Sequence, residues 1–232
     1  MERSPASPQL ITDGIYLELQ GIYHCKNISD RELISYEVLC RKKLGDTIVP
    51  PNQFLEDISP EDALALDLEV FRLALERPEH DLSINIFPSS LLDPSIIDFA
   101  KDNAEKIQRK NITLELVERQ PVTDFSAIAG IAFALKSLGI DFALDDFGTV
   151  NASLQNLLLL PVSKVKIDRS FLVDEVYSRD RLNILKRLCL TAKQPNAACK
   201  KPIPILEGVE NEALLGLGLE AGFRHFQGWL FS

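Results

Sequence analysis

Short apolar runs alternate with longer amphipathic segments along nearly the whole chain. The runs predict strands at 15–23, 33–40, 82–86, 112–118, 142–144, 164–167, 204–207 and 226–231. Between them, apolar residues spaced three or four positions apart predict helices at 60–77, 94–109, 124–138, 153–160, 174–192 and 211–221. Alternating strands and helices are typical of a parallel sheet that is either closed into a barrel or doubly wound.

The first two predicted strands differ from the others because only the polar segment 26–30 separates them. A link this short joins antiparallel neighbours, since a parallel pair needs a long crossover. Residues 1–13, which are polar and contain prolines, are predicted to be a loose N-terminal segment. Residues 14–232 are predicted to form a single domain, because no linker, repeat or low-complexity tract interrupts them.

Polar side chains fall at or near the carboxyl ends of successive predicted strands. These residues are Asn85, Glu115, Asp145, Lys166 and Glu207. In a closed barrel such strand ends meet at one mouth, where barrel enzymes place their chemistry. The chain has no glycine-rich phosphate loop that would support a doubly wound nucleotide fold. We therefore predict an α/β fold, a TIM-type (β/α)8 barrel whose first strand pair is antiparallel.

Two acidic features of the predicted strands need a partner. Asp145 and Asp146 are adjacent carboxylates, which repel each other and are costly to desolvate. A divalent cation would remove both costs, and the alternative is a solvated junction between strand and loop. Glu37 lies inside an apolar strand, where its partner is either a cation in a site or Arg41 in a structural salt bridge.

Composition narrows the function further. The 232 residues carry a net charge of −9, so no basic track for a nucleic-acid polymer or a membrane surface is expected. Three scattered histidines make a zinc site or a histidine triad a poor explanation, and the four cysteines form no CxxC pair. The sequence contains neither a membrane-spanning run nor a signal peptide, and we predict a cytoplasmic location.

Several blocks together resemble the EAL-domain family, phosphodiesterases and receptors for the bacterial second messenger cyclic di-GMP. The likeness extends from about Tyr16 to Ser232. The matching blocks are Glu37-Val38-Leu39 with Arg41, Asn85 with Pro88, Leu114 to Glu118, Asp145 to Thr149, Lys166 to Phe171, Glu207 to Glu210, and Gln227 to Phe231. Each block is weak alone, but together they follow the family's order.

The resemblance implies a modified barrel that holds two Mg²⁺ or Mn²⁺ ions and hydrolyses cyclic di-GMP to linear pGpG. Calcium is expected to inhibit. By matching position, Glu37, Asn85, Glu115 and Asp145 would ligate one ion, and Asp146 would help to hold the second. Glu207 would be the general base, Lys166 would neutralise charge and Gln227 would orient the nucleophile. The implied substrate contacts are Gln20, Leu39, Arg41 and Glu210, with Glu118 supporting the loop after Asp146.

The loop after Asp146 departs from the family pattern. It reads Val150-Asn151-Ala152-Ser153 where the family usually has Gly-Tyr-Ser-Ser, and a β-branched residue resists a positive φ. The alternative function is therefore a catalytically weak or inactive module that acts as a cyclic di-GMP receptor or a protein-interaction domain. The resemblance also leaves open a homodimer and a fused or separate sensor domain.

Overall fold

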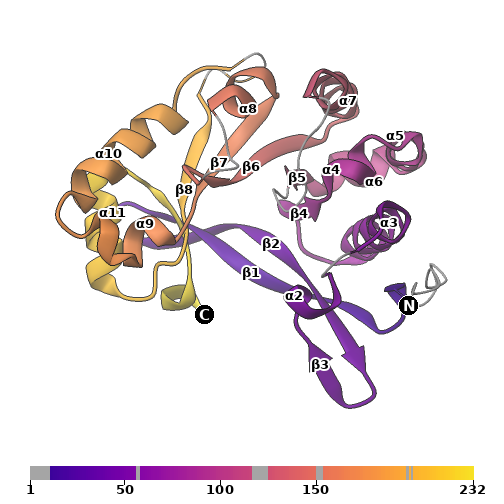
Figure 1. The fold of residues 1–232 in the computed structure, drawn as a ribbon, viewed down its shortest axis with the longest axis horizontal. Helices are drawn as coiled ribbons and strands as arrows, with labels where there is room; N and C mark the ends of the chain where they lie inside the picture. Colours follow the sequence, from indigo (N-terminus) through magenta and orange to yellow (C-terminus); the bar gives the residue numbers. More distant parts are fainter. Residues whose placement is uncertain (1–10, 56–57, 117–124, 150–153, 197–198, 200) are drawn as a thin grey trace, which may run out of the picture.

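The computed structural model describes residues 11–55, 58–116, 125–149, 154–196, 199 and 201–232. Within these residues, eight strands form a closed barrel (Figure 1). Their order around the ring is β1 (Ile15–Cys25), β9 (His225–Gln227), β8 (Ile203–Leu206), β7 (Val162–Ile167), β6 (Asp141–Phe147), β5 (Thr113–Leu116), β4 (Leu82–Ile86) and β2 (Arg31–Leu44), and β2 pairs with β1. The predicted TIM-type barrel is confirmed.

Strand β1 is the exception to the parallel arrangement. It runs antiparallel to both of its neighbours, β2 and β9, whereas the other pairs of barrel strands are parallel. The predicted antiparallel start is therefore confirmed. Strand β2 extends beyond the predicted 33–40, and its end forms a hairpin with β3 (Thr47–Val49), which the sequence pattern did not predict. Figure 1 shows this hairpin projecting beyond the barrel.

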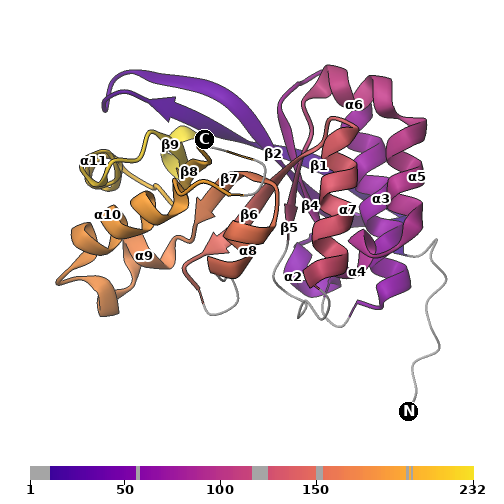
Figure 2. The same cartoon turned by 90° about the horizontal axis from the view of Figure 1, so that it is seen from above.

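Helices cover the outside of the barrel. They are α2 (Pro51–Phe54), α3 (Pro60–Glu76), α4 (Pro88–Leu91), α5 (Pro94–Asp102), α6 (Ala104–Lys110), α7 (Phe125–Ser137), α8 (Leu154–Leu159), α9 (Ser170–Val173), α10 (Arg181–Ala192) and α11 (Glu212–Ala221). Figure 2 shows α3, α5, α6 and α7 on one side of the barrel and α10 and α11 on the other. None of the described helices has both the length and the apolar character needed to cross a bilayer.

Two predicted helices are shorter than their apolar periodicity suggested. The helix predicted at 94–109 divides at Asn103, whose side-chain amide donates a hydrogen bond to the Phe99 carbonyl at 2.9 Å. The helix predicted at 174–192 begins only at Arg181, after a 3-10 turn at Glu175–Tyr177. At the first break the Asn103 side chain competes for a backbone group, and before the second break Arg181 Nη2 donates a hydrogen bond to the Asp174 carbonyl at 2.6 Å. An apolar period does not reveal either contact.

Helix α3 is fixed at its start and buried along one face. The Ser59 hydroxyl accepts a hydrogen bond from the Asp62 N–H at 3.1 Å, and Pro60 occupies the first turn. The buried face carries the apolar residues Ala63, Leu66, Val70, Phe71, Ala74 and Leu75. Asp67 lies on the same face and is only 6% exposed. A carboxyl group is seldom buried on the core-facing side of a helix unless it has a hydrogen-bond or ion-pair partner there.

The N-terminal prediction is only partly accessible to the structure. Strand β1 begins at Ile15, next to the predicted domain start at residue 14. Residues 1–10 lie outside the described part of the chain, so the loose segment at 1–13 stays a prediction.

Candidate active site

Each of the eight barrel strands brings one polar side chain to the same end of the barrel. Seven are strand residues, namely Gln20 (β1), Glu37 (β2), Asn85 (β4), Glu115 (β5), Asp145 (β6), Lys166 (β7) and Gln227 (β9), and Glu207 directly follows β8. The register places Gln20 opposite Glu37 and Asn85 opposite Glu115. We call these eight residues the mouth cluster. They include Asn85, Glu115, Asp145, Lys166 and Glu207, which were expected at the mouth from the sequence.

Lys166 lies at the centre of the mouth cluster and is 1% exposed. Its Nζ is 2.8 Å from Glu115 Oε2, 2.8 Å from Glu207 Oε1, 3.1 Å from Glu37 Oε2 and 3.2 Å from Asp145 Oδ1. Burial acts to lower the pKa of Lys166, but the four acids together outweigh burial and raise this pKa well above its usual value. One ammonium group thus faces four carboxyl groups, which leaves the cluster acidic.

Glu37 accepts hydrogen bonds from three side chains of the cluster. Besides Lys166, it accepts hydrogen bonds from Asn85 Nδ2 at 2.9 Å and from Gln227 Nε2 at 2.5 Å. Burial acts to raise the pKa of Glu37, but the Lys166 charge and these hydrogen bonds lower it overall. The Arg41 alternative is wrong, because the Arg41 Nε donates to Glu18 Oε2 at 2.7 Å.

Two further acids of the cluster, Glu115 and Glu207, hold their protons more strongly than usual. Burial raises the pKa of Glu115 to about 7, with Glu37 and Asp145 adding to the shift and Lys166 opposing it. Burial and the charges of Asp145 and Glu37 likewise raise the pKa of Glu207 well above its ordinary value. These directions are those of carboxyl groups held close together in excess over nearby cations.

Asp146 adopts an unusual backbone conformation that brings it toward Asp145. Consecutive strand residues normally point to opposite faces, but Asp146 has a φ of 49°, in the left-handed region. Its carbonyl accepts hydrogen bonds from the Thr149 N–H at 3.2 Å and the Thr149 hydroxyl at 2.9 Å. Asp145, Asp146 and Glu207 therefore offer one oxygen each, all within 4.8 Å of one another. Both side chains are half-buried, so this acidic pair is only partly exposed to solvent.

A tight contact between two turns positions Glu207 and Gln227. The Val209 N–H donates to the Gln227 carbonyl at 3.0 Å, and the Leu230 N–H donates to the Val209 carbonyl at 3.0 Å. Gly228 permits this approach, because a Cβ atom there would lie 2.3 Å from the Val209 oxygen. The turns after β8 and β9 are thus held together at the mouth.

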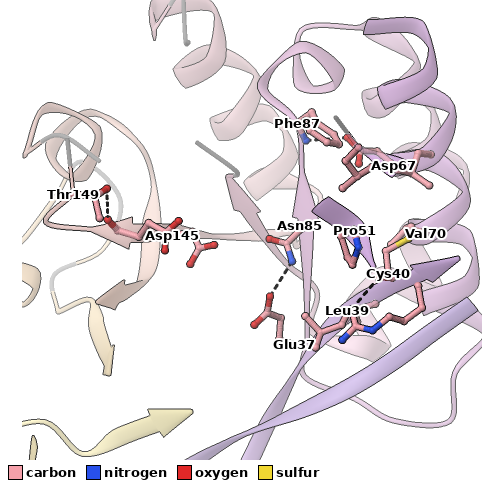
Figure 3. Close-up of a pocket in the computed structure, with 15 residues that line it drawn as sticks. Glu37, Leu39, Cys40, Pro51, Asp67, Val70, Asn85, Phe87, Asp145 and Thr149 are labelled. Carbon is pink, nitrogen blue, oxygen red and sulfur yellow. Dashed lines mark hydrogen bonds between the residues drawn. The ribbon is translucent and has the colours of Figure 1, made fainter. Parts of the chain in front are cut away.

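Two adjoining cavities open on either side of the acidic residues. The first, of about 410 Å³, is bounded by β2, α2 and α3 and is drawn in Figure 3. The second, of about 350 Å³, lies toward the turns after β7, β8 and β9. Both are lined by Glu37, Leu39, Asp145 and Asp146. The two cavities form one depression with the acids at its middle.

Asp67 is a wall residue of the first cavity that the sequence analysis missed. Its Oδ2 accepts the Phe87 N–H at 2.9 Å, and burial raises its pKa to about 7 (Figure 3). The signal was available in the sequence, because Asp67 interrupts the apolar face of its helix. Asp168 and Trp229 line the second cavity and were likewise given no role, although both stand in the matched blocks.

The remaining predicted residues occupy different places. Leu39 lines both cavities, and Arg41 lines the first. Glu210 lies on the surface, where its Oε1 is 3.6 Å from Arg169 Nη2, and only Arg169 of this pair lines the second cavity. Glu118 and the segment 150–153 lie outside the described residues.

The donor set of the mouth cluster fits hard divalent cations. Among the described residues, Glu115 Oε1 and Gln227 Oε1 are buried without a hydrogen-bond donor, and Asp145 Oδ1 is buried with only its ion pair to Lys166. Carboxylate and amide oxygens are the ligands that Mg²⁺, Mn²⁺ and Ca²⁺ prefer. The close oxygens of Asp145, Asp146 and Glu207 add a second group of the same kind.

This chain is similar to curated proteins that are named cyclic di-GMP phosphodiesterases. A cyclic di-GMP phosphodiesterase, PdeA of Borreliella burgdorferi, is 35% identical over 154 residues, which are 66% of this chain and 22% of that protein. The cyclic di-GMP phosphodiesterase PdeF of Escherichia coli is 27% identical over 212 residues, 86% of this chain and 28% of that protein. The chain thus spans less than a third of the length of these relatives.

Solved structures and a family model agree with these relatives. The calcium and cyclic di-GMP complex of Klebsiella pneumoniae BlrP1 superposes with a TM-score of 0.77 at 26% identity, covering 99% of this chain and 57% of that one. The EAL domain family model matches residues 6–232. The closed barrel, the acidic mouth and the match over almost the full sequence lead to one conclusion: this chain belongs to the EAL-domain family.

Proposed function

We propose that this chain is a metal-dependent phosphodiesterase that hydrolyses cyclic di-GMP to linear pGpG. The observation that carries the proposal is the complete mouth cluster, in which acids from β2, β5 and β6 and the residue after β8 share one lysine. Such an excess of buried acids is costly unless cations neutralise it. Relatives that bear the name of this activity support the choice of reaction.

The shape of the mouth suits a ligand with two bases and a phosphate between them. One cavity lies on each side of the acids, so a scissile phosphate at the middle would direct one base to each cavity. In the first cavity, the carboxyl of Asp67 would accept N–H groups from the edge of a guanine. In the second, the ring of Trp229 is 73% exposed and would offer a stacking surface.

We assign the metal-binding roles to Glu37, Asn85, Glu115, Asp145 and Asp146. Bound Mg²⁺ or Mn²⁺ would polarise the phosphate and acidify a water molecule. Glu207, whose pKa is raised by burial and by its acidic neighbours, would accept the proton of that water. Lys166 would balance negative charge beside the phosphate, and Gln227, which is hydrogen-bonded to Gln20 and Glu37, would orient the attacking water.

Product analysis tests the proposal. The chain is incubated with cyclic di-GMP and Mn²⁺, and pGpG is measured by chromatography. We expect turnover in the parent and its loss in Glu37→Ala and Glu207→Gln, while the exposed variant Lys106→Ala retains it. Replacing Mn²⁺ by Ca²⁺ should support binding with little product, because calcium tolerates looser geometry. Tight binding without pGpG from the parent in Mg²⁺ or Mn²⁺ would instead identify a receptor.

The wider setting of the reaction is proposed on the family resemblance alone. We place the protein in bacterial second-messenger signalling in the cytoplasm. A homodimer and a fused or separate sensor domain stay predictions.

A further inference from the structure

A third cavity lies at the opposite end of the barrel from the mouth cluster. It has a volume of about 310 Å³ and is formed where β8 and β9 begin, where α10 ends and where α11 turns into β9. Figure 2 shows α10 and α11 beside these two strands. Its charged or titratable lining residues are His24, Lys193, Lys201, Arg224 and His225. We call this set the basic cavity.

The basic cavity is unusual in a protein whose net charge is −9. Among the described residues that line it, none is acidic. Across the part of the chain that the structure describes, no ion pair joins any of its five basic residues to a carboxylate. Lysine and arginine elsewhere commonly pair with acids, as Arg41 does with Glu18. A concave group of unpaired cations attracts an anion.

Backbone contacts hold two of the cations in place. Lys193 Nζ donates to the Gly222 carbonyl at 3.0 Å, and Arg224 Nη1 donates to the Phe223 carbonyl at 2.5 Å. Arg224 Nη1 also donates to the Leu219 carbonyl at 3.2 Å. Neutral carbonyl groups leave the positive charges uncompensated, and among the described residues no hydrogen bond occupies Arg224 Nε or Nη2. The cavity is therefore partly organised before any ligand arrives, which lowers the cost of binding.

The two histidines give the cavity a means to respond to an anion. His24 and His225 are paired between β1 and β9, and their ring centroids are 5.1 Å apart. Burial and the neighbouring His24, Lys164 and Lys193 lower the pKa of His225 to about 4. An anion in the cavity would offset these positive neighbours and so favour the imidazolium form of His225.

We propose that the basic cavity binds a phosphate group carried by a small soluble molecule. Lysine, arginine and histidine N–H groups are the donors that recognise phosphate oxygens. The volume accommodates a phosphate with a small substituent, since it is at the lower end of the range for small-molecule sites. The site is separate from the mouth cluster and does not depend on the proposed hydrolysis.

The histidine NMR spectrum tests this proposal, because the chain has only three histidines. Inorganic phosphate, pyrophosphate and AMP are titrated at constant ionic strength without cyclic di-GMP or divalent metal. We expect saturable shifts of the His24 and His225 ring resonances and a rise in the pKa of His225. His80, which contacts the Arg109 carbonyl outside the cavity, serves as the internal reference. Binding of AMP at least as tight as that of inorganic phosphate supports a phosphate group carried by a small molecule, whereas tighter binding of inorganic phosphate would overturn it.

A charge-reversal pair supplies the control. Lys201→Glu/Arg224→Glu should weaken binding at least tenfold, whereas Lys101→Glu/Lys106→Glu, with the same charge change on α5 and α6, should alter it less than twofold. Lys201 and Arg224 are exposed, so the fold should tolerate their replacement. Absence of saturable shifts at 10 mM of each probe, equal shifts with chloride, or unchanged binding in Lys201→Glu/Arg224→Glu would overturn the proposal.

Discussion

At the scale of single residues, Lys166 is a buried cation that is surrounded by acids. Its ammonium contacts four carboxyl groups in the barrel interior. Removing one partner of a buried ionic group leaves uncompensated charge, which costs about 3–5 kcal/mol. In metal-free buffer at pH 8, Lys166→Met should therefore lower the free energy of unfolding by about this amount in urea titrations.

The exposed variant Lys106→Met should change the same quantity by less than about 0.5 kcal/mol. Addition of Mn²⁺ should reduce the difference in the free energy of unfolding between Lys166→Met and the parent, since the bound cations would replace the lost positive charge. Equal stabilities of the two variants without metal would contradict a role for Lys166 in holding the acids together.

Asp67 gives a second prediction at the level of one side chain. Burial raises its folded-state pKa from 3.8 to about 7, so the folded state favours the protonated carboxyl. The resulting stabilisation is fully present below pH 4 and is lost as the pH rises through 7. Asn mimics the protonated group, so Asp67→Asn should gain stability relative to the parent across this window. A shift of about three units corresponds to roughly 4 kcal/mol as an upper bound.

Chemical unfolding at several pH values between 4 and 8 measures the Asp67 effect. Asp98→Asn on the exposed side of α5 is the control and should show no comparable trend. If the free energies of unfolding of Asp67→Asn and the parent differ by the same amount at every pH from 4 to 8, the Asp67 carboxyl is ionised in the folded protein throughout this range.

Among the secondary-structure elements, α11 offers a matched pair of glycines. A Cβ atom at Gly218 would lie 2.6 Å from Phe226 Cε1 and 2.7 Å from Leu206 Cδ2, in the contact between the helix and strands β8 and β9. At Gly216 the nearest heavy atom, Ile28 Cδ1, would be 3.9 Å away, which is ordinary contact. The two positions share a helix but differ in packing.

Replacement by alanine should therefore have opposite effects at the two sites. Gly216→Ala should stabilise the protein by about 0.5–1 kcal/mol, because alanine favours the helix. Gly218→Ala should destabilise it by about 1–3 kcal/mol, because overpacking outweighs that gain. Urea unfolding measures the free energy of unfolding of each variant. If both variants are more stable than the parent, α11 can shift away from Phe226 and Leu206 to accommodate the added methyl group.

For the molecule as a whole, divalent metal should couple to folding. The barrel gathers the acids from all around the ring, so the unfolded chain offers no comparable site. Mn²⁺ at 100 times its dissociation constant should raise the free energy of unfolding by about 2.7 kcal/mol. Thermal unfolding with Mn²⁺ or with EDTA measures this gain, and Glu37→Ala should reduce it.

The same coupling should depend on pH. Without metal, the pKa of Glu115 is raised by burial to about 7, and that of Asp146, for the same reason and through Asp145, to about 6. Metal binding requires both groups to be deprotonated, so affinity should fall as the pH is lowered from 8 to 5. Calorimetric titration of Mn²⁺ at these pH values checks this, and an affinity independent of pH would exclude both acids as ligands.

The sequence by itself determined the order of the elements and the residues that the mouth collects. Local periodicity marks a strand or helix within a few residues, and parallel strand ends must share one side of a barrel. The positions of Glu115, Lys166 and Glu207 follow from that rule. The break at Asn103 and the β2–β3 hairpin were missed, because one hydrogen bond or one short strand leaves little periodic signal.

Only the tertiary structure decided which groups meet. Lys166 and Glu37 are 129 positions apart in the chain, yet the closed ring places them 3.1 Å from each other. The same closure excluded Arg41 as the partner of Glu37, placed Asp67 in the wall of a cavity and collected the basic cavity at the far end. Distances between strands depend on register, twist and closure, which arise from packing over the whole barrel and are not encoded in any local pattern.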